Sequence, residues 1–149
     1  MIAWAAAGEW PQRPPRGDAI GPAPASGVFG PILVVDDDAS IVEIVGEILA
    51  AEGYAVVTAA DGNEALRALD RTRPSLVLLD MRMPGLDGWG FARALAARGG
   101  DRPPIVVMTA AENAARWAKE IAADGHLAKP FEIAQLLATV ERHQKGRAP

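Results

Sequence analysis

Short apolar or β-prone runs alternate with amphipathic stretches along most of the chain. The runs lie at residues 32–35, 54–58, 76–79, 104–108 and 126–128. Runs of this length are too short for buried helices, and those that are apolar throughout suit strands covered on both faces. The pattern therefore predicts five strands in a parallel sheet.

Amphipathic stretches follow each of these runs and predict five helices. In the first stretch we expect the apolar positions at helical spacing to face the sheet: Ile41, Ile44, Val45, Ile48 and Leu49. Later stretches begin near Asp61 and Asp87, cover about residues 112–122 with Trp117 facing the core, and include residues 133–140. Strict alternation of strand and helix predicts a doubly wound α/β fold with right-handed crossovers and helices on both faces.

Composition supports one globular domain and excludes several kinds of site. The chain has 149 residues, of which 50% are hydrophobic, and a net charge of −4 with no basic run. Direct binding to nucleic acid or to an anionic membrane is therefore not expected. The chain has no cysteine and two histidines, which excludes disulfides, Cys-based zinc sites and His-rich metal sites.

The ends of the chain differ from its middle. Residues 1–30 are rich in Pro, Gly and Ala and predict a disordered tail, followed by a domain at 31–145 and a flexible end at 146–149. Glu9 and Pro11 interrupt the early apolar patch, so it does not resemble a signal peptide. A sharper alternative is that Trp4 and Trp10 dock on a partner. Without an apparent transmembrane segment, we expect a cytoplasmic location.

Polar residues follow four of the predicted strands: Asp36 and Asp37, Asp80, Thr109, and Lys129. The carboxyl ends of parallel strands meet at one edge of a sheet, so we expect these side chains to converge there. Three neighbouring carboxylates need a cation, and oxygen ligands alone favour Mg²⁺. A hydroxyl and an ammonium opposite that cluster form a receptor for a phosphoryl group, with Asp80 as the nucleophile.

Four motifs in order resemble the receiver domain of two-component response regulators over residues 32 to about 145. They are Val34-Val35-Asp36-Asp37, residues 79–85 (LDMRMPG) with Asp87-Gly88, Met108-Thr109-Ala110, and residues 127–131 (LAKPF). The resemblance implies a flavodoxin-like fold with strand order 2-1-3-4-5. It also implies that Asp80 accepts a phosphoryl group from a phosphohistidine on a sensor histidine kinase or a histidine phosphotransfer protein.

The resemblance also implies roles for the other strand-end residues. Mg²⁺ would be held by Asp37, Asp80 and the backbone carbonyl of Arg82, with Asp36 acting largely through water. Thr109 and Lys129 would hold phosphoryl oxygens, and Lys129-Pro130 would be a cis peptide. Thr109, His126 and Pro130 would form a switch that alters a partner surface on the last two helices and the fifth strand, with a homodimer as one option.

The chain departs from the family pattern in two places. His126 occupies a position that is usually aromatic, and its imidazole either pivots as that ring would or titrates near neutral pH. The chain between Thr109 and Lys129 is about two residues short, roughly half a helical turn, which suggests a short or loosened fourth helix. Arg82 and Ala111 lie where the family tunes hydrolysis of the acyl phosphate, and Arg82 could either shield or orient water.

Two other readings stay open beside a stand-alone receiver. Asp36-x-Asp38-x-Ser40 mimics the nucleophile motif of haloacid-dehalogenase-like phosphatases, although this would leave Asp80 without a role. A pseudo-receiver would keep the fold as an interaction module without phosphorylation. The sequence lacks the glycine-rich loops of nucleotide-binding folds. Only 18 residues follow Phe131, so we expect output through another protein rather than a second domain.

Overall fold

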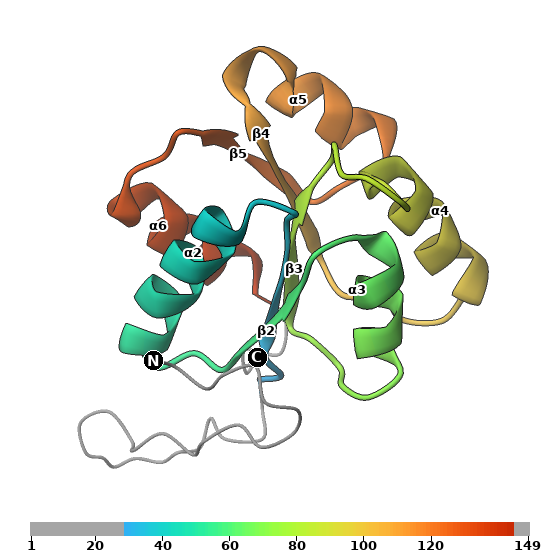
Figure 1. The fold of residues 1–149 in the computed structure, drawn as a ribbon, viewed down its shortest axis with the longest axis horizontal. Coiled ribbons are helices and arrows are strands. Elements are labelled where there is room, and N and C mark those ends of the chain that lie inside the picture. Colours follow the sequence, from blue (N-terminus) through green and yellow to red (C-terminus); the bar gives the residue numbers. More distant parts are fainter. Residues whose placement is uncertain (1–28, 145–149) are drawn as a thin grey trace.

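A computed structural model describes residues 29–144 of the chain (Figure 1). Residues 1–28 and 145–149, which include most of the predicted tail, both of its tryptophans and the end predicted to be flexible, lie outside the described residues. Gly30 was assigned to the tail, yet its carbonyl accepts a hydrogen bond of 2.7 Å from the Ser75 hydroxyl. The last residue before the predicted domain is thus attached to it.

Five strands form one parallel sheet in the order β2-β1-β3-β4-β5, as predicted. The strands are β1 (Ile32–Val35), β2 (Val56–Ala59), β3 (Leu76–Asp80), β4 (Ile105–Ala110) and β5 (Gly125–Lys129). Every residue of β1 and β3 is buried, because helices cover both faces of these central strands. This burial explains why their sequences are continuous apolar runs rather than alternating ones.

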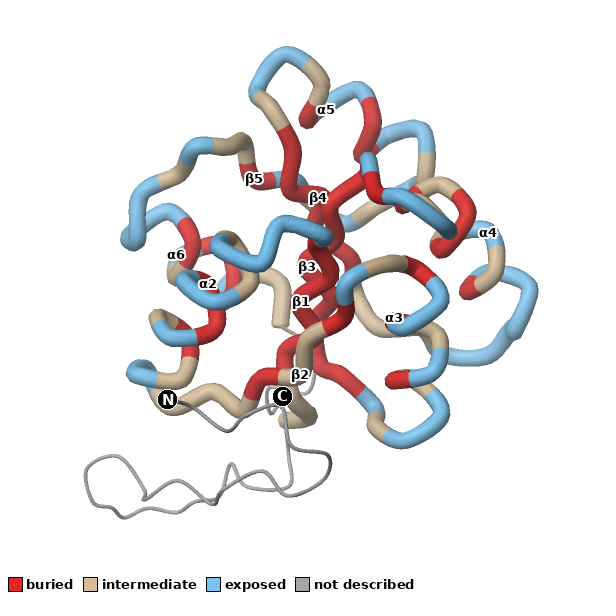
Figure 2. The backbone as a smooth tube through the Cα atoms, in the orientation of Figure 1, coloured by how far each residue is buried: buried red, intermediate tan, exposed pale blue. Residues whose placement is uncertain are grey.

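Five helices alternate with the strands and form two outer layers. They are α2 (Ala39–Ala51), α3 (Gly62–Leu69), α4 (Gly88–Arg98), α5 (Ala111–Glu120) and α6 (Ile133–His143). Figure 1 shows α2 and α6 on one side of the sheet and α3, α4 and α5 on the other. Each layer has its own apolar cluster against the sheet, and the buried segments of Figure 2 concentrate along the strands and the inner sides of the helices.

Three aspartates cap the starts of helices, and two of them, Asp61 and Asp87, lie where the sequence predicts helices to begin. The Asp38 carboxylate accepts hydrogen bonds from the Ser40 and Ile41 amides, at 2.9 and 3.4 Å. Asp61 caps α3 through the Glu64 amide and Asp87 caps α4 through the Gly90 amide, both at 2.9 Å. These bonds satisfy amide groups that have no partner within the first turn of a helix.

The predicted stripe on α2 is wrong at one position. Val45 and Leu49 are buried, but Ile44 is 54% exposed. The sheet covers only a narrow arc of the helix, centred on Val45 and Leu49, and Ile44 lies beyond it. Trp117 on α5 does face the core, as expected, and is 7% exposed.

Helix α5 is not unusually short, since its ten residues exceed the eight of α3. Instead, β4 ends at Ala110 and α5 starts at Ala111, so no residue separates them. No side chain caps this helix start. The shortening expected between Thr109 and Lys129 thus coincides with a strand that leads directly into a helix.

Gly88 allows the start of α4 to approach the end of β3. Its amide donates a hydrogen bond of 2.9 Å to the Met81 carbonyl. A Cβ at this position would lie 2.5 Å from Met81 Sδ, 2.8 Å from Met81 Cα and 3.0 Å from the Asp80 carbonyl oxygen. The last two are backbone atoms, which cannot move aside as the end of a flexible side chain can.

We expect Gly88→Ala to lower the free energy of unfolding by about 1–3 kcal/mol, because the added methyl group overpacks the strand end. Urea unfolding would measure the change. Gly90→Ala is a matched control in the same helical turn, since its nearest contact is the Cδ1 atom at the end of the Leu86 side chain. Equal costs for the two variants would show that the approach of α4 to β3 is not the constraint.

None of the helices within residues 29–144 combines the length and the apolar character needed to cross a bilayer.

Candidate functional site

The strand-end residues predicted from the sequence lie at one edge of the sheet. Asp36 directly follows β1, Asp80 is the last residue of β3, and Lys129 is the last residue of β5. Thr109 is the next-to-last residue of β4, which lies between β3 and β5. Because all five strands are parallel, their carboxyl ends lie on the same side of the molecule.

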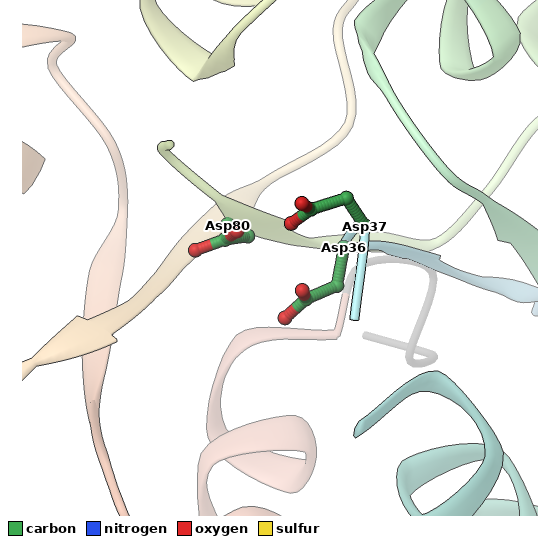
Figure 3. Close-up of side chains that lie close together, drawn as sticks. All are labelled: Asp36, Asp37 and Asp80. Atoms are coloured by element: carbon green, nitrogen blue, oxygen red, sulfur yellow. The ribbon is translucent and has the colours of Figure 1, made fainter. Parts of the chain in front are cut away.

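Three carboxylates converge at this edge. One oxygen each from Asp36, Asp37 and Asp80 lies within 4.8 Å of the others. Figure 3 shows that the Asp37 and Asp36 side chains extend from the end of β1 toward the side on which Asp80 lies. Asp36 and Asp80 are buried, at 2% and 7% exposure, whereas Asp37 is exposed. The cluster therefore has a buried base and one side open to solvent.

Lys129 joins two of these carboxylates. Its Nζ donates a hydrogen bond of 2.8 Å to Asp36 Oδ2 and lies 3.5 Å from Asp80 Oδ1. The other Asp36 oxygen accepts a hydrogen bond of 2.9 Å from the Asp38 amide. Both oxygens of Asp36 are therefore held, whereas the Asp80 carboxylate has, among residues 29–144, only the longer contact with Lys129. Asp80 is the carboxylate with more freedom to react.

Burial and charge raise the pKa of Asp80 to about 6. Desolvation is the largest cause, and the nearby charge of Asp36 adds to it, while Lys129 opposes both. Burial by itself would lower the pKa of Lys129, but the hydrogen bond and charge of Asp36, with a contribution from Asp80, raise it above its ordinary value. At neutral pH the site thus holds an ionised Asp80 and a charged Lys129.

Thr109 adds a hydroxyl to the same edge. The residue is 7% exposed, and its neighbour Ala110 pairs with Lys129 in the sheet register. Within residues 29–144, no hydrogen bond involves the Thr109 hydroxyl. A buried hydroxyl without a partner carries a desolvation cost, which a ligand with acceptor oxygens would remove.

The remaining predicted residues lie around this cluster. His126 belongs to β5 and is exposed, and the expected cis peptide between Lys129 and Pro130 is present. Arg82 is two residues beyond Asp80 and exposed, with its guanidinium 5.1 Å from the centre of the Trp117 ring. Sequence reasoning placed Trp117 in the core but missed this contact, because helical spacing carries no information about a loop on another element.

A cavity of about 350 Å³ lies beside the cluster, between α2 and β2. Its acidic lining consists of Asp36, Asp37, Glu43, Glu47 and Glu64. Sequence reasoning also missed these glutamates, although Glu43 and Glu47 are four residues apart and share a helix face.

The carboxylates of Asp36, Asp37 and Asp80 offer only oxygen ligands and have one side open to solvent. They therefore fit a hard divalent cation such as Mg²⁺.

Comparison with known proteins gives a consistent result. The family described as the response regulator receiver domain matches residues 32–141. The chain is 41% identical over 111 residues to the DNA-binding response regulator MtrA of Mycobacterium leprae, covering 73% of this chain and 48% of the relative. It is also 41% identical over 118 residues to the transcriptional regulatory protein PrrA of Mycobacterium bovis, covering 78% and 51%. The chain thus spans about half the length of these relatives.

Solved structures resemble the chain over nearly their full length. The chemotaxis response regulator CheY4 of Vibrio cholerae is 33% identical, with a TM-score of 0.67, and the match covers 76% of this chain and 98% of that one. The receiver domain of NtrX from Brucella abortus is 34% identical, with a TM-score of 0.69, and the match covers 75% and 96%. These similarities agree with the strand order and the helical layers described above.

Proposed function

Because the chain belongs to the response regulator receiver domain family, we propose that it is a signalling switch in which Asp80 accepts a phosphoryl group. The observation that carries the proposal is the position of Asp80. It ends β3 at the open edge of the sheet, beside Asp36 and Asp37 and 3.5 Å from Lys129. In parallel α/β folds this edge is where ligands bind.

The transfer requires an ionised Asp80. A pKa of about 6 leaves this side chain mostly as the carboxylate at neutral pH, and burial leaves it poorly solvated. An Asp80 oxygen attacks the phosphorus atom, the bond from phosphorus to the donor's imidazole nitrogen breaks, and an acyl phosphate forms. Positioning and neutralisation of charge supply most of the catalysis in such a transfer.

Asp36, Asp37 and Asp80 are the residues that would hold Mg²⁺, together with the backbone carbonyl of Arg82. Bound there, the ion would neutralise charge on the phosphoryl oxygens. Its presence would also offset the mutual repulsion of three carboxylates, one of which is 2% exposed.

Lys129 and Thr109 would bind the transferred group. Lys129 contacts both Asp36 and Asp80, so a small movement of its ammonium brings it to a phosphoryl oxygen on Asp80. Thr109 offers a hydroxyl that has no other hydrogen bond in the described part of the chain. Movement of Thr109 acts directly on α5, since Ala110 and Ala111 join strand and helix without a loop.

The partners follow from this chemistry. The donor would be the phosphohistidine of a sensor histidine kinase or a histidine phosphotransfer protein. The downstream partner, or a second copy of the chain, would bind α5, β5 and α6, whose outward side chains include the exposed His126 and Ile133. We propose Thr109, His126 and Pro130 as the residues that change between the two states of this surface.

Incubation with acetyl phosphate and Mg²⁺ tests the proposal. We expect intact-mass spectrometry to show one labile phosphoryl group on the wild type and none when EDTA replaces Mg²⁺. An unmodified wild type, with beryllofluoride also failing to bind, would favour the pseudo-receiver reading and overturn the proposal.

A turnover assay separates the phosphatase alternative. In that alternative Asp36 is the nucleophile and Asp38 is its acid partner, but here Asp36 is held by Lys129 and Asp38 caps α2. We expect no turnover of a phosphate monoester such as p-nitrophenyl phosphate. Turnover that is lost in Asp36→Ala would instead support the phosphatase.

A further inference from the structure

The Arg82 guanidinium rests on an aromatic ring instead of on a carboxylate. It lies 5.1 Å from the centre of the Trp117 ring, and it forms no ion pair within residues 29–144. The same side chain lines a hollow of about 320 Å³ with Met83, Pro84, Asp87 and Trp89. Arg82 therefore has one weak partner and space in which to move.

Trp117 is a fixed platform for this arginine. The residue is 7% exposed and belongs to the apolar cluster beneath α5. The Trp89 ring meets it edge-on, with ring centres 4.9 Å apart and planes at 69°. The indole N–H of Trp89 donates a hydrogen bond of 2.9 Å to Glu120 Oε1 on α5. These contacts fix the ring, so the guanidinium is the mobile partner of the pair.

Arg82 is also within reach of Asp80. The two residues are two positions apart in the chain, so their Cα atoms lie at most about 7 Å apart, and the arginine side chain is about as long. A phosphoryl group on Asp80 would offer several anionic oxygens in a geometry that a guanidinium binds in a bidentate manner. The ring and the phosphoryl group are thus alternative partners for one cation.

We propose that Trp117 is a positioning residue that competes with the phosphoryl group on Asp80 for the Arg82 guanidinium. The inference rests on the function proposed above. Without a phosphoryl group Arg82 lies on the ring, and with one it divides between the ring and the phosphoryl oxygens. Because Trp117 belongs to α5, this exchange connects the chemical state of Asp80 to that helix.

The exchange controls how long the acyl phosphate survives. In hydrolysis a water oxygen bonds to phosphorus, the bond from phosphorus to the Asp80 oxygen breaks, and the water's proton leaves with the inorganic phosphate or to solvent. The attacking water must approach opposite the Asp80 oxygen, from the outer side of the phosphoryl group. Arg82 bound to the outer oxygens occupies that side, so it slows hydrolysis, and Trp117 opposes this protection.

A double-mutant cycle tests the proposal. Each protein is phosphorylated with acetyl phosphate and Mg²⁺, transferred to donor-free buffer, and followed by intact mass. We expect Trp117→Leu to lengthen the half-life of the phosphoryl group about twofold to fivefold, the factor that corresponds to an exposed cation–π contact. Arg82→Gln should shorten it, and adding Trp117→Leu to Arg82→Gln should change nothing further.

Two more variants serve as controls for packing and for charge. Trp117→Phe keeps an aromatic face and the core packing, and should give a half-life between those of wild type and Trp117→Leu. If Trp117→Leu folds poorly, Trp117→Phe still tests the proposal, because its half-life should exceed that of the wild type. Arg116→Gln removes an equal charge beside the same ring, where the guanidinium carbon lies 5.8 Å from the ring centre, and should change the half-life less than Arg82→Gln.

The outcomes separate this inference from the proposed function. If the wild type takes up no phosphoryl group, the proposed function fails. If the wild type is labelled but Trp117→Leu changes the half-life equally with and without Arg82, Trp117 acts only through packing and the competition is refuted. A longer half-life in Arg82→Gln would refute the shielding.

Discussion

The Asp80→Asn variant is expected to take up no phosphoryl group from acetyl phosphate and Mg²⁺, while the wild type takes up one. The amide of Asn has nearly the shape of the carboxylate, so the fold and the surrounding side chains should be retained. Its oxygen, however, carries no charge and is a poor nucleophile. Asp36, the buried neighbour, is held by Lys129 and the Asp38 amide and is therefore not equally free to replace Asp80. Intact-mass spectrometry measures the result directly.

Asp87→Asn is the matched control for this loss. Asp87 follows the same strand and its carboxylate caps α4 through the Gly90 amide. Asn caps helices about as well as Asp, so this variant removes the same charge without unfolding the helix. We expect it to be labelled like the wild type. A labile phosphoryl group at full stoichiometry on Asp80→Asn would remove Asp80 as the acceptor.

In metal-free buffer, the stability of the wild type is expected to fall relative to Asp80→Asn between about pH 4 and pH 7. Burial and the charge of Asp36 raise the pKa of Asp80 from 3.8 to about 6 in the folded protein. The folded state therefore holds this proton more tightly than the unfolded state. The stabilisation that protonated Asp80 contributes to the folded state is complete below pH 3.8 and is lost as the pH rises through 6.

The size of the effect follows from the pKa change. The full change corresponds to about 3 kcal/mol, and solvent screening at this partly open site reduces it, so we expect about 1–3 kcal/mol. Urea unfolding at several pH values would measure the difference between wild type and Asp80→Asn. Mg²⁺ should stabilise the wild type more than the variant, because it binds the folded carboxylates. A difference in stability that does not change with pH would contradict the raised pKa of Asp80.

Much of the fold was predictable because its signals are local. Runs such as residues 76–79 are apolar throughout because both faces of a central parallel strand are covered. Asp61 and Asp87 indicated helix starts because a short acceptor side chain satisfies the free amides of the first turn. Strand boundaries were less certain, as for β2, which was expected at 54–58 and lies at Val56–Ala59.

Ile44 shows where this kind of reasoning stops. It has the same helical spacing as Val45 and Leu49, yet it is 54% exposed while they are buried. Periodicity indicates which side chains share a helix face, but the width of the contact depends on the partner surface. The central strands cover only part of the apolar face of α2.

The sequence by itself determined which residues lie at the functional edge, because a strand pattern places Asp36, Asp80, Thr109 and Lys129 at strand ends. Only the tertiary structure decided how they are paired. Lys129 binds Asp36 across 93 positions of the chain, and Arg82 lies on the Trp117 ring instead of on a carboxylate. Such contacts depend on the distances between separate elements and on the side-chain rotamers that packing permits. Local patterns of hydrophobicity and capping do not encode these quantities.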